Sequence, residues 1–256
     1  MITVSKKDYD AVKKKIKEAP TFVFSILDNV INGTVYSNST SFDNLIIQTD
    51  SGLYYVTGIM PDHSFFENIV CIFEDSVMKG RRFTLFTSTE NWYRVIEENL
   101  GERLKKIERY SFSFELNTYL NRKRSSHNNY NVEKINESHI KNCLEFDKQY
   151  YDEYWDSVSN FIQNGFGFCV IENNQIISEA VSIFRSIDYA EVDIITDSNY
   201  RGKGLASIVA VQFIEYCRSH NIQPRWDCDI NNNASIQLGN KLGFNNPQKY
   251  RIYVKS

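Results

Sequence analysis

Residues 196–207, which read Thr-Asp-Ser-Asn-Tyr-Arg-Gly-Lys-Gly-Leu-Ala-Ser, have the composition of a loop that binds a phosphate group. A β-rich run precedes them, and a helical run begins within them, so the first N–H groups of that helix lack intrahelical partners and the helix dipole favours an anion. The two glycines allow positive φ and close approach, and the two basic residues add charge. The residues predicted to surround a diphosphate are Arg201, Gly202, Lys203, Gly204, Leu205, Ala206 and Ser207.

Two predicted strands carry pairs of carboxylates. Glu191 and Asp193 lie two residues apart and therefore share one face of a strand, and Asp227 and Asp229 repeat this spacing on the next strand. Carboxylates at the ends of neighbouring strands would attract a cationic substrate, and we expect Asp227 and Asp229 to bind it. The alternative is that some of them face solvent or cap the next helix. No metal site is expected, because the histidines at positions 63, 127, 139 and 220 show no ligand spacing.

A second motif occupies residues 232–244, Asn-Asn-Ala-Ser-Ile-Gln-Leu-Gly-Asn-Lys-Leu-Gly-Phe. Asn232 is a good N-cap for a helix, Gly243 fits the position just after its end, and Phe244 fits the hydrophobic contact that accompanies such a glycine. An ordinary capped helix explains these residues singly. It does not explain their order or their distance from the first loop.

Together the two segments resemble the GNAT superfamily of N-acetyltransferases. Arg201, Gly204 and Ala206 fill the defined places of its loop R/Q-x-x-G-x-G/A, and the second motif is similar to its A-S-I-x-L helix ending in K-x-G-F. A dinucleotide-binding loop would need a third glycine, and the P-loop pattern is absent. The resemblance covers about residues 130–256 and implies a GNAT fold that binds acetyl-CoA as co-substrate. The further residues it assigns to acetyl-CoA, through backbone or side chain, are Ile194, Ile195, Thr196, Asn232 and Ser235.

The resemblance implies an N-acetyltransferase that moves the acetyl group directly, in a ternary complex, to the primary amine of a small, cationic molecule. The amine must lose a proton first. Glu191, preceded by alanine, resembles the strand glutamate that is the base in some family members, and Asp193 is the second candidate catalytic residue. Many members carry a tyrosine acid at the place of Gly239, so the general acid stays open. The alternative is a non-catalytic acyl-CoA-binding or regulatory protein with this fold.

An aromatic cluster lies where the substrate-facing helices of the family lie. Trp155 is predicted to bind the amine through cation–π contacts, and Tyr150, Tyr151 and Tyr154 lie beside it. Core packing is the alternative explanation for most of these side chains.

The elements that must position these residues follow from periodicity and turn residues. The predicted elements are a strand at 130–135, helices at 137–146 and 153–163, strands at 166–172 and 176–186 around a turn at 173–175, a strand at 189–196, a helix at 205–218, a strand at 225–230, a helix at 233–242 and a strand at 250–255. A meander followed by alternating helices and strands predicts an α/β (α+β) fold with a mixed sheet.

The first half shows a similar order of elements. A hairpin at 45–57 precedes a helix at 64–78, a strand at 83–87, a helix at 90–98 and a strand at 107–115. Because this order repeats that of the second half, we expect residues 1–120 to form a degenerate GNAT-like domain that walls the substrate cleft. Its loop at 58–63 lacks Arg-x-x-Gly-x-Gly, so no pyrophosphate site is expected there. A polar linker at 121–129 and a catalytic domain at 130–256 complete the predicted organisation.

The composition of the chain limits the classes of molecule that it is expected to bind. The net charge of −3 and pI near 5.9 argue against a nucleic-acid or membrane-surface binder. No apolar run reaches the roughly 18 residues of a membrane span, and the polar start is no secretory signal. The 5 cysteines lack C-x-x-C spacing and are expected as reduced, mostly core, thiols. We expect a cytoplasmic protein whose partner is a small amine, with a homodimer as one alternative for its oligomeric state.

Overall fold

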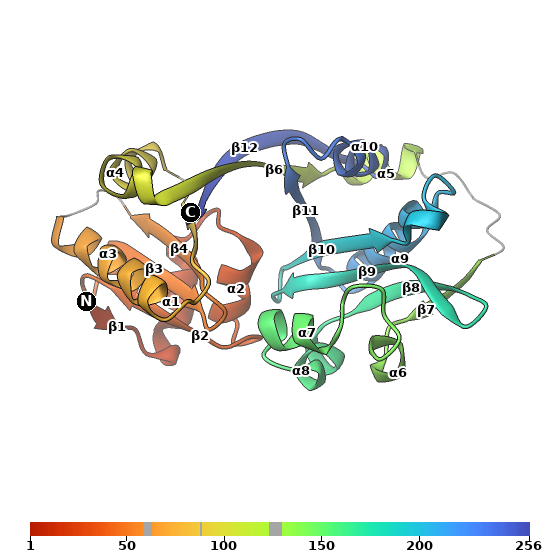
Figure 1. Ribbon diagram of the computed structural model, residues 1–256, viewed down its shortest axis with the longest axis horizontal. Coiled ribbons are helices and arrows are strands. Elements are labelled where there is room, and N and C mark those ends of the chain that lie inside the picture. The colour runs from red at the N-terminus through yellow and green to blue at the C-terminus, as the bar shows by residue number, and fades with distance from the viewer. Residues whose placement is uncertain (59–62, 88, 123–129) are drawn as a thin grey trace. The chain divides into compact units, whose positions relative to one another are not determined.

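The computed structural model of the chain describes residues 1–58, 63–87, 89–122 and 130–256 (Figure 1). The chain divides into two compact units: the first unit is Met1–Arg109 with Lys249–Ser256, and the second unit is Tyr110–Gln248. This division differs from the predicted break at 121–129, of which positions 123–129 lie outside the described residues. The difference arises because strands β6 (Leu104–Phe114) and β12 (Phe244–Lys255) each run from one unit into the other.

The first unit is an antiparallel meander that leads into a parallel strand–helix–strand crossover. Its further elements are β1 (Ile2–Thr3), α1 (Tyr9–Lys15), α2 (Thr21–Leu27), β2 (Gly33–Ser37), β3 (Asn44–Thr49), β4 (Leu53–Gly58), α3 (His63–Met78), β5 (Thr84–Thr87) and α4 (Glu90–Leu100). The strand order is β1-β2-β3-β4-β5-β12-β6. Strand β4 pairs parallel with β5, and β12 pairs antiparallel with β5. The sequence did not predict the elements before β3.

The second unit has the same kind of order. Its further elements are α5 (Leu116–Arg122), β7 (Asn131–Lys134), α6 (Glu137–Ile140), α7 (Lys148–Trp155), α8 (Val158–Asn164), β8 (Gly167–Glu172), β9 (Gln175–Arg185), β10 (Tyr189–Thr196), α9 (Leu205–Ser219), β11 (Gln223–Asp229) and α10 (Asn233–Lys241). The strand order is β6-β11-β10-β9-β8-β7. Strands β7 to β10 pair antiparallel, and β10 pairs parallel with β11. The predicted mixed α/β fold is confirmed.

Turn residues decide where several elements of the second unit end. Asn173 and Asn174 adopt φ of 51° and 61°, which a two-residue hairpin turn between β8 and β9 requires. The predicted helix at 153–163 is instead two helices, because Asp156 adopts φ of 63° and ends α7, and Ser157 then caps α8 by accepting from the Asn160 N–H at 3.1 Å.

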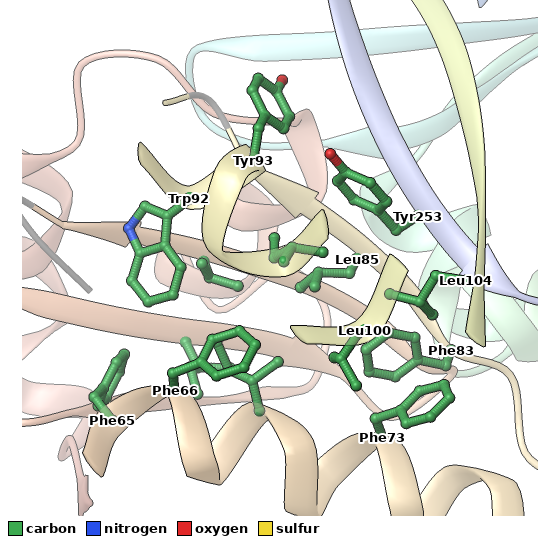
Figure 2. Close-up of a cluster of buried hydrophobic side chains, with 14 residues drawn as sticks. Phe65, Phe66, Phe73, Phe83, Leu85, Trp92, Tyr93, Leu100, Leu104 and Tyr253 are labelled. Carbon is green, nitrogen blue, oxygen red and sulfur yellow. The ribbon is translucent and has the colours of Figure 1, made fainter. Parts of the chain in front are cut away.

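The core of the first unit gathers side chains from both of its long helices (Figure 2). The ring of Phe65 on α3 packs edge-on against Trp92 on α4, with ring centroids 6.3 Å apart. Tyr253 of β12 belongs to the same cluster, is 1% exposed, and donates its hydroxyl to Glu97 at 2.7 Å. The last strand of the chain is therefore part of the core of the first unit.

The core of the second unit lies mainly between its sheet and α9. Leu205 and Val209 of α9 are buried against Val170, Ile177 and Ala180 of the sheet. This packing fixes the first turn of α9 at the carboxyl end of β10. All 5 cysteines are free; those at 169, 217 and 228 are buried as expected, whereas the one at 71 is exposed.

Candidate functional site

The parallel strands of the second unit separate toward their carboxyl ends. In the described part of the chain, the register of β10 with β11 joins Tyr189–Glu191 to Gln223–Arg225 and ends there, although both strands continue. On the other side of β10, the register with β9 shifts between Glu191 and Val192, as it does at a β-bulge. The strand edges beyond Glu191 and Arg225 thus border a gap, and we call this feature the β10–β11 gap.

The N–H groups of β10 that were predicted as hydrogen-bond donors point to two different edges of the strand. The Asp197 N–H donates to the Ile177 carbonyl at 3.0 Å, toward β9. Because successive peptide groups of a strand point to opposite edges, the N–H groups of Ile194 and Thr196 point to the β10–β11 gap, and that of Ile195 points to β9. The prediction that backbone donors face this side therefore suits Ile194 and Thr196 but not Ile195.

The loop between β10 and α9 has the backbone that its glycines were expected to provide. Gly202 and Gly204 adopt φ of 78° and 82°, and Gly204 is the N-cap residue of α9. A Cβ atom at either position would meet nothing within 4 Å, so within the protein these glycines serve the backbone conformation rather than close packing. The surface beside both residues is open to a ligand.

The first turn of α9 presents unused backbone donors. The Ile208 N–H is bonded to the Gly204 carbonyl at 3.2 Å, so the N–H groups of the three residues before it precede the first helical hydrogen bond. The hydroxyl of Ser207 is buried and has no hydrogen-bond partner among the described residues. Arg201 and Lys203 are exposed, and the Lys203 ammonium lies 4.4 Å from the centroid of the Tyr200 ring. This donor set fits a diphosphate.

Helix α10 shows why position 239 carries no side chain. Asn232 caps the helix by accepting from the Ser235 N–H at 3.0 Å, and the Ser235 hydroxyl accepts from Trp226 Nε1 at 3.1 Å. A Cβ atom at Gly239 would lie 3.1 Å from that same Nε1 atom. The indole of Trp226 therefore occupies the space into which a larger side chain at 239 would extend. Asn232 and Ser235 both have local structural roles, and their contact with a cofactor stays a prediction.

The predicted carboxylates are half-buried and occupy the expected strand faces. Glu191 lies opposite Arg225 in the parallel register, and the Arg225 guanidinium stacks on the Tyr189 ring at 3.7 Å. The carboxylate of Asp229 accepts from the Asn231 N–H at 2.8 Å within the turn before α10, and the residue that caps α10 is Asn232 rather than Asp229.

Asp193 has a partner that the sequence did not reveal. Its Oδ2 atom accepts from the Tyr150 hydroxyl at 3.0 Å, and its Oδ1 atom accepts from the Ile194 N–H at 3.0 Å. Tyr150 was recognised only as a member of an aromatic cluster. No local signal in the sequence links α7 to β10, so only the fold could identify this contact.

Trp155 is not at the surface of a site, which corrects its predicted role in substrate binding. Its side chain is fully buried, its Nε1 atom donates to the Ser182 carbonyl at 2.9 Å, and its ring packs against Phe161. Core packing, which was the alternative explanation, therefore accounts for Trp155. On the same helix, Tyr150 reaches a carboxylate.

The fold and the site together define a class of protein: a mixed-sheet α/β protein whose parallel strands separate beside a helix N-terminus suited to a diphosphate. The sequence matches the GNAT acetyltransferase family over residues 12–253. It is 40% identical over 253 residues to the uncharacterized N-acetyltransferase YdfB of Bacillus subtilis strain 168, with 98% of this chain and 97% of that protein covered. The chain belongs to the GNAT acetyltransferase family and is an acetyl-CoA-dependent N-acyltransferase.

Solved structures show the same fold. A GCN5-related N-acetyltransferase-like protein from Streptococcus suis 89/1591 superposes with a TM-score of 0.72 at 21% identity, covering 98% of this chain and 99% of that one. A tandem GNAT protein from the clavulanic acid biosynthesis pathway gives a TM-score of 0.58 at 10% identity, covering 99% and 97%. The family match is wider than the predicted residues 130–256 and includes most of the first unit.

Membership of the family brings two general properties. GNAT proteins use acetyl-CoA as co-substrate, and they act on amines of small molecules or of proteins. Within the described ranges, no helix combines the length and the apolar character needed to cross a membrane. Nor do the described His, Cys, Asp and Glu residues gather in threes that could hold a metal ion.

Proposed function

We propose that this chain transfers the acetyl group of acetyl-CoA to the primary amine of a small, cationic molecule, directly and within a ternary complex. The observation that carries the proposal is the β10–β11 gap, which has Glu191 and Asp193 on one of its strands and leads directly into the loop before α9. A carboxylate beside a site for a diphosphate is the combination that amine acylation by a CoA thioester needs.

The diphosphate of acetyl-CoA would be held by the N–H groups of the first turn of α9 and by the charges of Arg201 and Lys203. When bound, acetyl-CoA supplies a thioester carbonyl, which is the electrophile. The Thr196 N–H group, pointing to the gap, is suited to donate to an oxygen that becomes more negative as the amine attacks, whereas the Ile194 N–H already donates to Asp193. The Ser207 hydroxyl is a further donor that has no partner among the described residues.

The acceptor amine is an ammonium at neutral pH and must lose a proton before it can attack. Glu191 is the proposed base, with Asp193 the second candidate, because both lie on the strand that borders the gap. Asp227 and Asp229 on β11 add negative charge that favours a cationic acceptor. The first unit, which has the same order of strands and helices, is proposed to be a degenerate copy of the fold.

Replacement of Glu191 by glutamine tests this function. We expect amine-dependent release of free thiol from acetyl-CoA to fall by about 100-fold or more, because the base is lost, while calorimetric CoA affinity is unchanged. Glu145→Gln, which changes an exposed carboxylate of the same unit, is the matched control and should keep the wild-type rate. An unchanged rate in Glu191→Gln would remove Glu191 from the mechanism.

We keep as a second candidate a member of this enzyme family that has lost its activity and only binds acyl-CoA. Trp226 fills the space next to Gly239, so position 239 offers no side chain to protonate a leaving thiolate. Wild-type protein that binds CoA in the calorimeter, yet releases no thiol with a broad panel of diamines, aminoglycosides and amino-acid amides, would establish this second function. Protein that does not bind CoA would contradict both.

A further inference from the structure

The carboxylate of Asp193 is held from two sides. Its two oxygen atoms accept hydrogen bonds from different elements, one from the Tyr150 hydroxyl on α7 and the other from the Ile194 N–H on β10, each at 3.0 Å. The Ile194 N–H points to the β10–β11 gap, so the carboxylate that it binds lies at the gap as well. A carboxylate with a donor on each oxygen has little freedom to rotate.

Tyr150 is suited to hold a carboxylate and unsuited to give up its proton. Burial, followed by the negative charge of Asp193 and the hydrogen bond to it, raises the pKa of Tyr150 well above its ordinary value of 10.0. The hydroxyl therefore stays protonated, and remains a donor, at any pH at which the protein works. A phenol with so high a pKa is a weak acid, which argues against proton transfer by Tyr150 itself.

The position of Tyr150 is fixed by another carboxylate, that of Glu179, which is fully buried. Oε1 of Glu179 on β9 accepts hydrogen bonds from three successive backbone N–H groups, those of residues 144–146, at 3.1 to 3.3 Å. Asp147 then caps α7 by accepting from the Tyr150 N–H at 3.0 Å. On α7 the ring of Tyr150 packs 4.9 Å from that of Tyr154, which limits its rotamers. The sheet thus fixes the start of the helix that carries the hydroxyl.

We propose that Tyr150 is a positioning residue that holds the Asp193 carboxylate at the β10–β11 gap, where the acceptor amine is acylated. The inference rests on the proposed function for the reaction but on the observed contacts for the position. Tyr150 does not touch the reacting atoms; it acts through Asp193. Without the hydroxyl, the Asp193 side chain would rotate away from the gap, and acceptor turnover would fall while acetyl-CoA binding stayed the same.

Tyr150→Phe tests the proposal, and Tyr151→Phe on the same helix is its matched control. The Tyr151 side chain is buried, and its hydroxyl has no hydrogen-bond partner among the described residues, so its loss should not lower the melting temperature. Loss of a hydrogen bond to a charged carboxylate should lower the melting temperature of Tyr150→Phe by about 3–6 °C. In an Asp193→Ala background the same change should have no effect, because the acceptor is already gone.

The second half of the test is a measurement of steady-state kinetics. In Tyr150→Phe, kcat/KM for the amine should fall about tenfold with KM for acetyl-CoA unchanged, and this loss should vanish in the Asp193→Ala background. If Asp193→Ala does not fold, Asp193→Asn takes its place, and the loss should then be reduced rather than abolished.

The outcomes separate this inference from the proposed function. Wild-type rates in Tyr150→Phe, or a tenfold loss that persists without the Asp193 carboxylate, would overturn the inference while leaving the acetyltransferase intact. Wild-type protein that acetylates no amine would overturn the proposed function, and the melting temperatures would still decide the contact: additive changes for Tyr150→Phe and Asp193→Ala would show that the hydroxyl does not hold the carboxylate.

Discussion

The parallel strand pairs of the two units differ in how far they stay together. In the first unit, Leu53–Val56 of β4 pair with the whole of β5. In the second unit, β10 and β11 pair only as far as Glu191 and Arg225 and then separate, although each strand continues. The units share an order of elements, but among the described residues both parallel strands continue past their last paired residues only in the second unit. The site that we propose therefore lies where strand pairing stops, a feature that the shared order of strands and helices does not determine.

The glycines at the two crossovers also differ between the units, in how closely other atoms pack around them. Gly58 ends β4 with φ of 146°, and a Cβ atom there would overlap Asn44 Oδ1 and lie 2.6 Å from the Asp43 carbonyl oxygen. Gly204 has φ of 82° and nothing within 4 Å of the place where its Cβ would be. The first glycine is needed for packing, whereas the second leaves backbone open to a ligand.

The largest expected effect concerns the helices that follow the two crossovers. Helix α4 buries Trp92 completely, whereas the buried residue of α10 is Gly239, against the indole of Trp226. Trp92→Ala should lower the free energy of unfolding by about 4 kcal/mol through the cavity it leaves. Gly239→Tyr should lower it by about 2 kcal/mol through overpacking, and Trp226→Val should restore part of that loss. Urea denaturation measures both, and a neutral Gly239→Tyr would contradict the steric explanation.

A smaller difference is expected between the crossover glycines. Gly58→Ala should cost about 3 kcal/mol of unfolding free energy, because the new Cβ meets backbone as well as side-chain atoms. Gly204→Ala should cost about 1 kcal/mol, from the positive φ alone. The same urea titration applies, with CoA affinity of folded Gly58→Ala as control, which should equal that of the wild type. Equal losses at the two positions would remove the distinction between them.

The smallest expected effect is a dependence of stability on pH. In the first unit, the buried carboxylate of Asp28 is paired with Lys13 at 2.7 Å, whereas the second unit buries Glu179, whose pKa is raised above 4.5 by burial, against the backbone N–H bonds that lower it. The folded chain keeps this proton at a pH where the unfolded chain has lost it. The free energy of unfolding should therefore fall as pH rises from about 4.5 through the raised pKa.

Glu179→Gln removes the titrating group and should flatten this part of the stability curve. Glu137→Gln changes an exposed carboxylate of the same unit that does not contribute to the pKa shift of Glu179, and it should leave the curve as it is in the wild type. Thermal unfolding measured at increasing pH from 4.5, the ordinary pKa of a glutamate, gives the slope. Parallel curves for wild type and Glu179→Gln would show that Glu179 does not titrate there.

Local signals in the sequence were sufficient for the loop and the two helices around the site. Asn232 and Gly243 occupy the cap positions that their residue types predicted, and Gly204 has the expected positive φ, because these features depend on a few neighbouring residues. The helix predicted at 137–146 was wrong beyond Ile140, since the backbone of residues 144–146 bonds to Glu179 on a distant strand instead.

Contacts between segments that lie far apart in the sequence could not be predicted from local sequence patterns. Tyr150 and Trp155 are both aromatic residues of one helix, and nothing in their surroundings in the sequence indicates that the first reaches Asp193 and the second enters the core. The passage of β6 and β12 from one unit into the other could not be predicted for the same reason. Strand pairing between segments far apart in the sequence leaves no local signal.

The place of Tyr253 in the core of the first unit has a consequence for how the protein is made. Synthesis proceeds from the N-terminus, so the ribosome has released nearly all of the second unit before Lys249–Ser256 emerges to complete the sheet of the first. Until then, the edge of β5 in the first unit has no partner strand, and an unpaired strand edge favours aggregation during translation. Supplying residues 249–256 as a separate peptide to a chain that stops at Gln248 would show whether this late strand can be added in trans.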